Sequence, residues 1–217
     1  MFGPHAKLLK SEFSAEYCTG LFSDELDQLG ERGRVVTGFC LNRSTLRMFG
    51  RARTIRLETM ETSDERIRDG LGFLDRLNEG DVLLVEGSRE FAYFGELMSR
   101  MAMRRRLSGV VIDGLTRDTY FTTTIDLPIF ARGYSPVDIK GRGRVAAVDV
   151  DITIGGLTVS PGDFVFGDND SVVLMKEARM PELLERVNRT AAREDQIKRH
   201  IAAGMSVDEL LKVTSSF

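Results

Sequence analysis

The chain has 217 residues, of which 42% are hydrophobic and 29% are charged, and its formal net charge is -3. This mildly acidic balance is typical of a folded globule and does not suit a nucleic-acid partner, because nucleic-acid-binding proteins usually present a basic face. The sequence has no run of about 18 apolar residues for a membrane span and no secretory signal pattern at its start, so we expect a cytoplasmic protein without a membrane partner.

The first half of the chain alternates helical and strand patterns. Apolar residues recur at helical spacing in three segments, and short runs of branched apolar residues are typical of buried strands. The strand, helix, strand order of the last three segments favours a parallel pair joined by a crossover. The predicted elements are a helix over 22–30 that begins near Ser23 or Asp24 and ends at Gly30, a helix over 63–81, a strand over 81–87, a helix over 95–107 that ends at the basic run 104–106, and a strand over 109–113 that turns at Asp113-Gly114.

The second half is rich in strand patterns separated by turn residues. A long charged helix and a capping box, in which Ser206 precedes Glu209 by three residues, follow these strands. The sequence therefore predicts an α/β fold class with a mixed sheet and C-terminal helices, in one domain over 1–217. The predicted strands cover 127–133, 143–156 and 163–175, the last broken at 167–170, and the helix covers 180–204.

The motifs that carry chemistry are few. His5 and His200 do not suffice for a histidine-based triad or a histidine-rich metal site. The two cysteines, Cys18 and Cys40, form neither a disulfide framework nor a CxxC pair. No glycine-rich phosphate loop is present, which leaves a nucleotide or methyl-donor site without support. Carboxylates and arginines remain as the candidate functional groups.

Three such residues belong together by position. Arg117 and Asp118 follow the end of a predicted strand, and Glu96 begins the helix that leads into that strand, with twenty residues between Glu96 and Arg117. Because open α/β sheets bind ligands beyond the carboxyl ends of their strands, we expect the two loops to meet at one edge.

This set of groups suits a small anionic 2-oxo acid. The first-turn amides of Leu97 and Met98 are candidates to bind a carboxylate, Arg117 offers a planar fork of donors, and Asp118 could hold a hydrated divalent cation. Two simpler alternatives stay open. Arg117 and Asp118 could form a surface ion pair worth about 0–1 kcal/mol, and Glu96 could only stabilise the helix dipole.

Five ordered blocks of the sequence resemble the RraA-like family, which includes the class II 4-hydroxy-4-methyl-2-oxoglutarate / 4-carboxy-4-hydroxy-2-oxoadipate aldolases and RraA, a regulator of RNase E. The resemblance implies an α-β-β-α sandwich with a core over about 22–175, a C-terminal helical extension over about 180–217, and a homotrimer or homohexamer with active sites at subunit interfaces. The blocks are "FSDELDQLG", "GDVLLVEG", "FGELMSRMAMRRRLSGVVIDGLTRD", "PIFARG" and "GGLTVSPGDFVFGDNDSVVLM".

The resemblance also implies an activity: Mg²⁺- or Mn²⁺-dependent retro-aldol cleavage of a 4-hydroxy-2-oxo acid to pyruvate through a metal-stabilised enolate, with oxaloacetate decarboxylation as a side activity. The aldolases carry an aspartate, twenty residues, and then Arg-Asp; here Glu96 replaces that aspartate. By resemblance, Asp118 and a neighbouring subunit's Glu194 serve the metal and its water. Arg117 contacts the substrate and stabilises charge, Gly95, Leu97 and Met98 bind the substrate, and Glu96 with Arg117 orients a water that protonates the enolate.

Two alternatives to this activity stay open. The chain could be a non-catalytic regulator of the RraA type that binds an RNase E-like protein and needs no metal. It could also be a related lyase that acts on another 2-oxo acid, such as a sugar-derived one. The segments 39–58 and 119–128 are candidates to shape substrate specificity.

Overall fold

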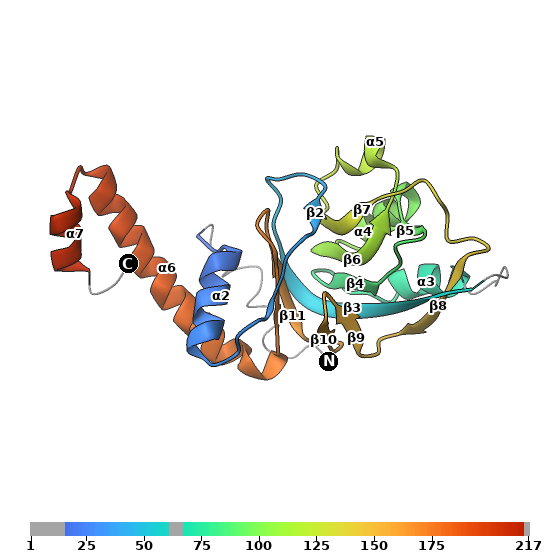
Figure 1. The fold of residues 1–217 in the computed structure, drawn as a ribbon, viewed down its shortest axis with the longest axis horizontal. Helices are drawn as coiled ribbons and strands as arrows, with labels where there is room; N and C mark the ends of the chain where they lie inside the picture. Colours follow the sequence, from blue (N-terminus) through green and yellow to red (C-terminus); the bar gives the residue numbers. More distant parts are fainter. Residues whose placement is uncertain (1–15, 61–66, 215–217) are drawn as a thin grey trace. The chain divides into compact units, whose positions relative to one another are not determined.

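The computed structural model describes residues 16–60 and 67–214. The chain divides into two compact units. The larger unit spans Gly33–Glu177, and the smaller one joins the residues up to Arg32 with those from Ala178 onward. Figure 1 shows the elements of both units. The expected single domain over 1–217 stays a prediction.

The larger unit is built on a mixed sheet, in which β3, the long cyan strand of Figure 1, pairs with three neighbours. The pairs β3–β4, β4–β6, β5–β6 and β6–β7 are parallel and the others are antiparallel, so the predicted mixed sheet and parallel crossover are confirmed. The strand order of the main sheet is β1 (Val35–Val36), β12 (Val172–Met175), β11 (Phe164–Gly167), β3 (Met48–Thr59), β4 (Val82–Glu86), β6 (Gly109–Thr116), β7 (Ile129–Tyr134), β2 (Cys40–Leu41). In addition, β5 (Ala92–Phe94) pairs with β6, and β8 (Gly143–Val148) pairs with β3. A separate antiparallel pair is formed by β9 (Ile152–Ile154) and β10 (Leu157–Val159).

The central strands are buried on both faces. Along β4, Leu83 and Val85 join a core that includes residues of helices α3 (Ile67–Leu74) and α4 (Glu96–Arg104). The alternate residues Val82 and Leu84 join a second core, shared with β9, β10, β11 and β12. Because successive side chains of a strand point to opposite faces, a strand between two cores must be apolar throughout. This accounts for the unbroken apolar run that the sequence shows here.

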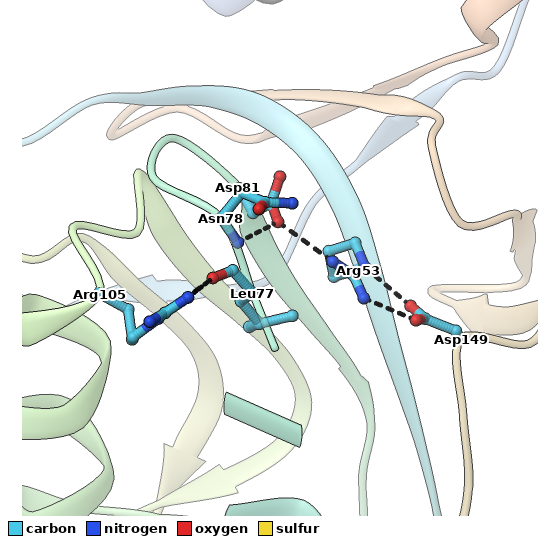
Figure 2. Close-up of polar contacts among 6 residues, drawn as sticks. All are labelled: Arg53, Leu77, Asn78, Asp81, Arg105 and Asp149. Carbon is cyan, nitrogen blue, oxygen red and sulfur yellow. Dashed lines mark hydrogen bonds and ion pairs between the residues drawn. The ribbon is translucent and has the colours of Figure 1, made fainter. Parts of the chain in front are cut away.

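An ionic cluster ties β3 to the start of β4 (Figure 2). The Arg53 guanidinium donates to both carboxylate oxygens of Asp149, at 2.8 and 2.6 Å, and more weakly to Asp81 at 3.3 Å. The buried Asp81 carboxylate also accepts the Asn78 N–H at 2.8 Å. Arg105, which caps the end of α4, donates to the Leu77 carbonyl at 3.1 Å, so the helix end is anchored as well.

The smaller unit is helical. It contains α2 (Thr19–Gln28), α6 (Met180–Ala202) and α7 (Val207–Val213), and the short 3-10 helix η1 (Glu177–Arg179) precedes α6. The buried Glu25 carboxylate of α2 accepts from Arg186 at 2.8 Å and from Thr190 at 2.7 Å, both on α6. The predicted capping box is confirmed, since Ser206 and Glu209 hydrogen-bond to each other's backbone amides.

Several predicted boundaries are wrong. Helix α2 begins at Thr19, before the expected start, because the buried Leu21 and Phe22 extend its apolar face. Strand β6 does not turn at Asp113-Gly114 but continues to Thr116 through a register shift, at which Arg132 donates to Asp113 at 2.7 Å. The stretch 143–156 forms two strands, β8 and β9, and the chain has positive φ at Asp149 between them.

Other expectations are met, corrected, or fall outside the described residues. Gly30 follows α2 with a φ of 78°, as a helix stop should. The predicted helix over 63–81 extends too far, because α3 ends at Leu74 and the chain turns at 75–76 and 79–80 before β4; 63–66 and His5 lie outside the described residues. Cys18 and Cys40 are free and exposed. No helix within the described ranges is both long and apolar enough to cross a membrane.

Candidate active site

The site is assembled where β5 and β6 end. The Phe94 carbonyl, at the end of β5, accepts from the Thr116 hydroxyl at 2.7 Å and from the Arg117 N–H at 3.0 Å. These two bonds place Gly95 and Glu96, which open α4, beside Arg117 and Asp118, which follow β6. The expected meeting of the two loops at one edge is therefore observed.

The Asp118 carboxylate faces the first amide of α4. Its Oδ2 accepts the Glu96 N–H at 2.8 Å, and a Cβ added to Gly95 would stand 2.3 Å from the same oxygen. Gly95 is therefore required by the close approach of this carboxylate. Asp118 itself adopts the left-handed conformation, with φ 60° and ψ 46°, which Asp tolerates better than most residues. Among the described residues, no hydrogen bond or ion pair involves its Oδ1.

Arg117 is oriented by a carboxylate that the sequence analysis did not identify. Its Nη1 lies 3.0 Å from Asp138 Oδ2, and its Nε lies 3.6 Å from Asp118 Oδ2. Although burial raises the pKa of Asp138, the hydrogen bonds from the Lys140 N–H and Arg117 lower it more, so the pKa falls below its usual range. Asp138 is thus an anion at neutral pH and fixes the direction of the Arg117 guanidinium.

Among the described residues, the Glu96 carboxylate binds Arg100 and Tyr120 and makes no direct hydrogen bond or ion pair with Arg117, and the expected water oriented by Glu96 and Arg117 stays a prediction. Its Oε1 accepts from Arg100 at 2.8 Å, and its Oε2 accepts from the Tyr120 hydroxyl. The reason is the longer side chain, which lies along α4 and reaches the residue one turn later. The hydrogen bonds from Tyr120 and Arg100 lower the pKa of Glu96, so this carboxylate stays ionised at neutral pH.

The first turn of α4 leaves backbone donors at the site. Amides at the second and third helical positions, here Leu97 and Met98, have no acceptor within a helix, and they lie at the positive end of the helix dipole. The Leu97 side chain is 76% exposed, whereas Met98 is buried in the core and anchors the turn. Binding of a substrate carboxylate by Gly95, Leu97 and Met98 stays a prediction.

The donor set can be compared with what a divalent cation requires. Within 16–60 and 67–214, no three His, Cys, Asp or Glu side chains gather into a ligand cluster. Mg²⁺ commonly keeps several waters and binds through one or two carboxylates plus substrate oxygens, and Asp118 with its uncommitted Oδ1 fits that mode. Glu194 lies on α6 of the smaller unit, 3.9 Å from Lys198, and its expected service to a neighbouring subunit's metal water stays a prediction.

Three contacting residues of this site were not singled out from the sequence, although one of them, Tyr120, lies in the candidate specificity segment 119–128. Arg100 could have been found, because it stands four residues after Glu96 on the predicted helix. Tyr120 belongs to the short helix α5 (Thr119–Thr122), which the sequence did not predict. Asp138 gives no local signal. It reaches the site because the Ala92 N–H donates to the Val137 carbonyl at 2.8 Å and aligns this loop with β5.

Comparisons with known proteins identify the family of the chain. Residues 19–174 match the model of the RraA-like family, described as Aldolase/RraA. The chain is 32% identical over 107 residues to a protein of Aromatoleum aromaticum named "Putative 4-hydroxy-4-methyl-2-oxoglutarate aldolase", an alignment that covers 48% of this chain and 67% of that protein. It is 25% identical over 189 residues to protein DlpA of Legionella pneumophila, covering 86% of this chain but only 31% of DlpA.

A solved structure shows the same fold. Streptomyces coelicolor RraAS2, described as an unusual member of the RNase ES inhibitor RraA protein family, superposes with a TM-score of 0.79 at 24% identity. The superposition covers 91% of this chain and 98% of RraAS2. The predicted fold class, including the mixed sheet and the C-terminal helix, is therefore confirmed, and at this identity the likeness concerns the fold alone.

Proposed function

Since the chain belongs to the RraA-like family, we propose that it is a divalent-metal-dependent lyase that cleaves a 4-hydroxy-2-oxo acid to pyruvate and also decarboxylates oxaloacetate. Relatives that carry aldolase names support a lyase. The observation that carries the proposal is the convergence of the Asp118 carboxylate and the Arg117 guanidinium on the first turn of α4. An isolated surface ion pair would not need a glycine at position 95, nor a second carboxylate, that of Asp138, bound to the Arg117 guanidinium.

The reaction places defined demands on these groups. Cleavage of the C3–C4 bond turns the 4-hydroxyl into a carbonyl with loss of its proton. The electron pair passes to the pyruvyl fragment, which then takes a proton at C3. A Mg²⁺ or Mn²⁺ ion held by Asp118 would supply Lewis acidity to the keto and carboxylate oxygens of the substrate. The chain's own residues must bind the substrate, orient it and balance the charge that develops on it.

Arg117 and the start of α4 meet these demands in this proposal. The amides of Leu97 and Met98 bind the carboxylate next to the keto group. Arg117, aimed by Asp138 at 3.0 Å, presents a fixed positive charge to the fragment that becomes negative. Glu96, an anion bound to Arg100 and Tyr120, orients with Arg117 the water that protonates the enolate.

The assembly and location that we propose follow from the family. A homotrimer or homohexamer would bring Glu194 of one subunit toward the site of the next, and the protein would act in the cytoplasm. Sedimentation velocity of the purified chain distinguishes a trimer from a hexamer. A monomer that retains full activity would remove the proposed role of Glu194.

The test is pyruvate release from oxaloacetate and from 4-hydroxy-4-methyl-2-oxoglutarate with Mg²⁺, with Mn²⁺ and with EDTA. We expect metal-dependent release that Asp118→Asn lowers at least 100-fold, because the amide keeps an acceptor for the Glu96 N–H but loses the charge. Glu185→Gln is the matched control, since this exposed carboxylate pairs with Arg189 and lies outside the candidate specificity segments. No pyruvate under any metal would overturn the proposal and favour a protein-binding role.

A further inference from the structure

Tyr120 hydrogen-bonds to Glu96 at the proposed site and has no role in the proposed reaction. Its side chain is 74% exposed, although aromatic residues usually bury their rings, and the neighbouring Leu97 on α4 is 76% exposed. Of the four tyrosines in the chain, Tyr17 and Tyr93 are buried and only Tyr134 is also exposed, at 46%. Exposure of two large side chains around Glu96 therefore needs an explanation.

The position of Tyr120 is set by contacts between α4 and α5. Its hydroxyl donates to Glu96 Oε2, while Arg100 binds Oε1 of the same carboxylate at 2.7 Å. Arg100 also stacks on the ring of Phe121, 4.3 Å from its centroid. The Tyr120 and Phe121 contacts join α4 to α5, so Tyr120 is held against Glu96 at the start of α4.

These contacts decide what the Tyr120 hydroxyl can offer a ligand. A tyrosine hydroxyl has one proton to donate and lone pairs to accept with. Its proton is committed to Glu96, so its oxygen is left as an acceptor for a hydroxyl group of a bound molecule.

The committed proton of Tyr120 disfavours an anionic ligand group at the same place. Glu96 is paired with Arg100, so the feature that a ligand group meets here is the acceptor oxygen of the Tyr120 hydroxyl. An additional carboxylate brings only acceptor oxygens, whereas a neutral hydroxyl group can donate its proton to Tyr120. Leu97 and Tyr120 are both exposed and offer apolar surface to the substrate carbons.

We infer that Tyr120 is a specificity-determining residue of the 2-oxo acid lyase site, and that it selects substrates whose group beyond C4 is neutral and hydroxylated over those that carry a second carboxylate. The inference rests on the proposed function and names its substrate class. The expected leaving product is accordingly a neutral hydroxyaldehyde and not an oxo acid.

Three substrates that differ only in the group on C4 test the inference: 4,5-dihydroxy-2-oxopentanoate, 4-hydroxy-2-oxopentanoate and 4-hydroxy-2-oxoglutarate. They offer a hydroxymethyl, a methyl and a carboxylate group, and all release pyruvate. For the wild type with Mg²⁺ or Mn²⁺ we expect kcat/KM to fall in that order. Tyr120→Phe keeps the ring, so it should lower kcat/KM about five- to tenfold for the hydroxymethyl substrate, as the loss of one neutral hydrogen bond does, and leave the methyl substrate within twofold.

Tyr134→Phe is the matched control, because it removes the hydroxyl from the other exposed tyrosine and should leave all three values unchanged. An equal loss for every substrate in Tyr120→Phe would show a structural role and overturn the inference. So would a wild type that prefers the carboxylate substrate. Pyruvate from none of the three, nor from oxaloacetate, would instead overturn the proposed function, and the inference with it.

Discussion

At the scale of single residues, the site depends on which oxygen of each carboxylate is already engaged. Asp118 uses Oδ2 for the Glu96 N–H, and Asp138 uses Oδ2 for Arg117. Glu96 uses both of its oxygens, for Arg100 and for Tyr120. A carboxylate that is fully engaged positions its neighbours, and one with an uncommitted oxygen can still bind a ligand. This difference assigns the metal to Asp118 and a positioning role to Glu96 in our proposal.

Replacement of the Arg117 guanidinium by an ammonium group should separate the effect of its charge from the effect of its hydrogen-bond geometry. Arg117→Lys keeps the positive charge but cannot face Asp138 and a substrate oxygen with a planar set of donors. We expect kcat/KM for pyruvate release to fall about 10- to 100-fold, in line with the loss of a charged hydrogen bond worth roughly 1.5–3 kcal/mol. Arg189→Lys, on an exposed ion pair of α6, is the control. Wild-type kcat/KM in Arg117→Lys would contradict the proposed role.

At the scale of elements, buried charges fasten helices to their neighbours. In the smaller unit, Glu25 of α2 is 3% exposed and binds Arg186 and Thr190 of α6. In the larger unit, the Phe94 carbonyl joins β5 to the end of β6 and thereby aligns two loops that carry the site. The two loops that follow β5 and β6 are thus positioned by hydrogen bonds at the ends of these strands.

Loss of the Glu25 carboxylate should destabilise the pairing of α2 with α6. Glu25→Ala leaves Arg186 and Thr190 without their acceptor, and we expect the free energy of unfolding to fall by about 3 kcal/mol in urea. Glu25→Gln keeps an acceptor for Thr190 and should lose less. Glu185→Ala breaks an exposed pair with Arg189 and should change stability by less than about 0.5 kcal/mol. Equal losses in the two alanine variants would refute the role of burial.

At the scale of the whole molecule, the larger unit is held together by two apolar cores on opposite faces of one sheet. The strands between them have little room for polar groups, so the ionic cluster of Arg53, Asp81 and Asp149 lies at the start of β4 (Figure 2). Asp149 accepts from Nε and Nη2 of Arg53, which leaves Asp81 only the contact with Nη1 at 3.3 Å. Asp81 is therefore the group of this cluster that burial affects most.

Stability should depend on pH through Asp81. Burial raises the pKa of its carboxyl above the ordinary 3.8, despite the hydrogen bonds from Asn78 and Arg53. A carboxyl with a higher pKa in the folded state contributes stability below pH 3.8 that is lost as the pH rises through the folded-state pKa. Asp81→Asn, which cannot ionise, should therefore gain stability relative to the wild type between pH 3 and pH 6 in urea unfolding. A difference that stays constant across this range would refute the prediction.

Local signals in the sequence predicted the fold class, most elements and the three candidate residues Glu96, Arg117 and Asp118, because hydrophobic periodicity and residues that follow strand ends are read within short windows. Which side chains meet depends on the tertiary structure. Asp138 and Tyr120 reach Arg117 and Glu96 through contacts between segments distant in sequence. β3 was not predicted, because the partly buried Arg51, Arg53 and Arg56 interrupt the apolar pattern of this interior strand. Pairing across a sheet is a long-range property, and no window of sequence contains it.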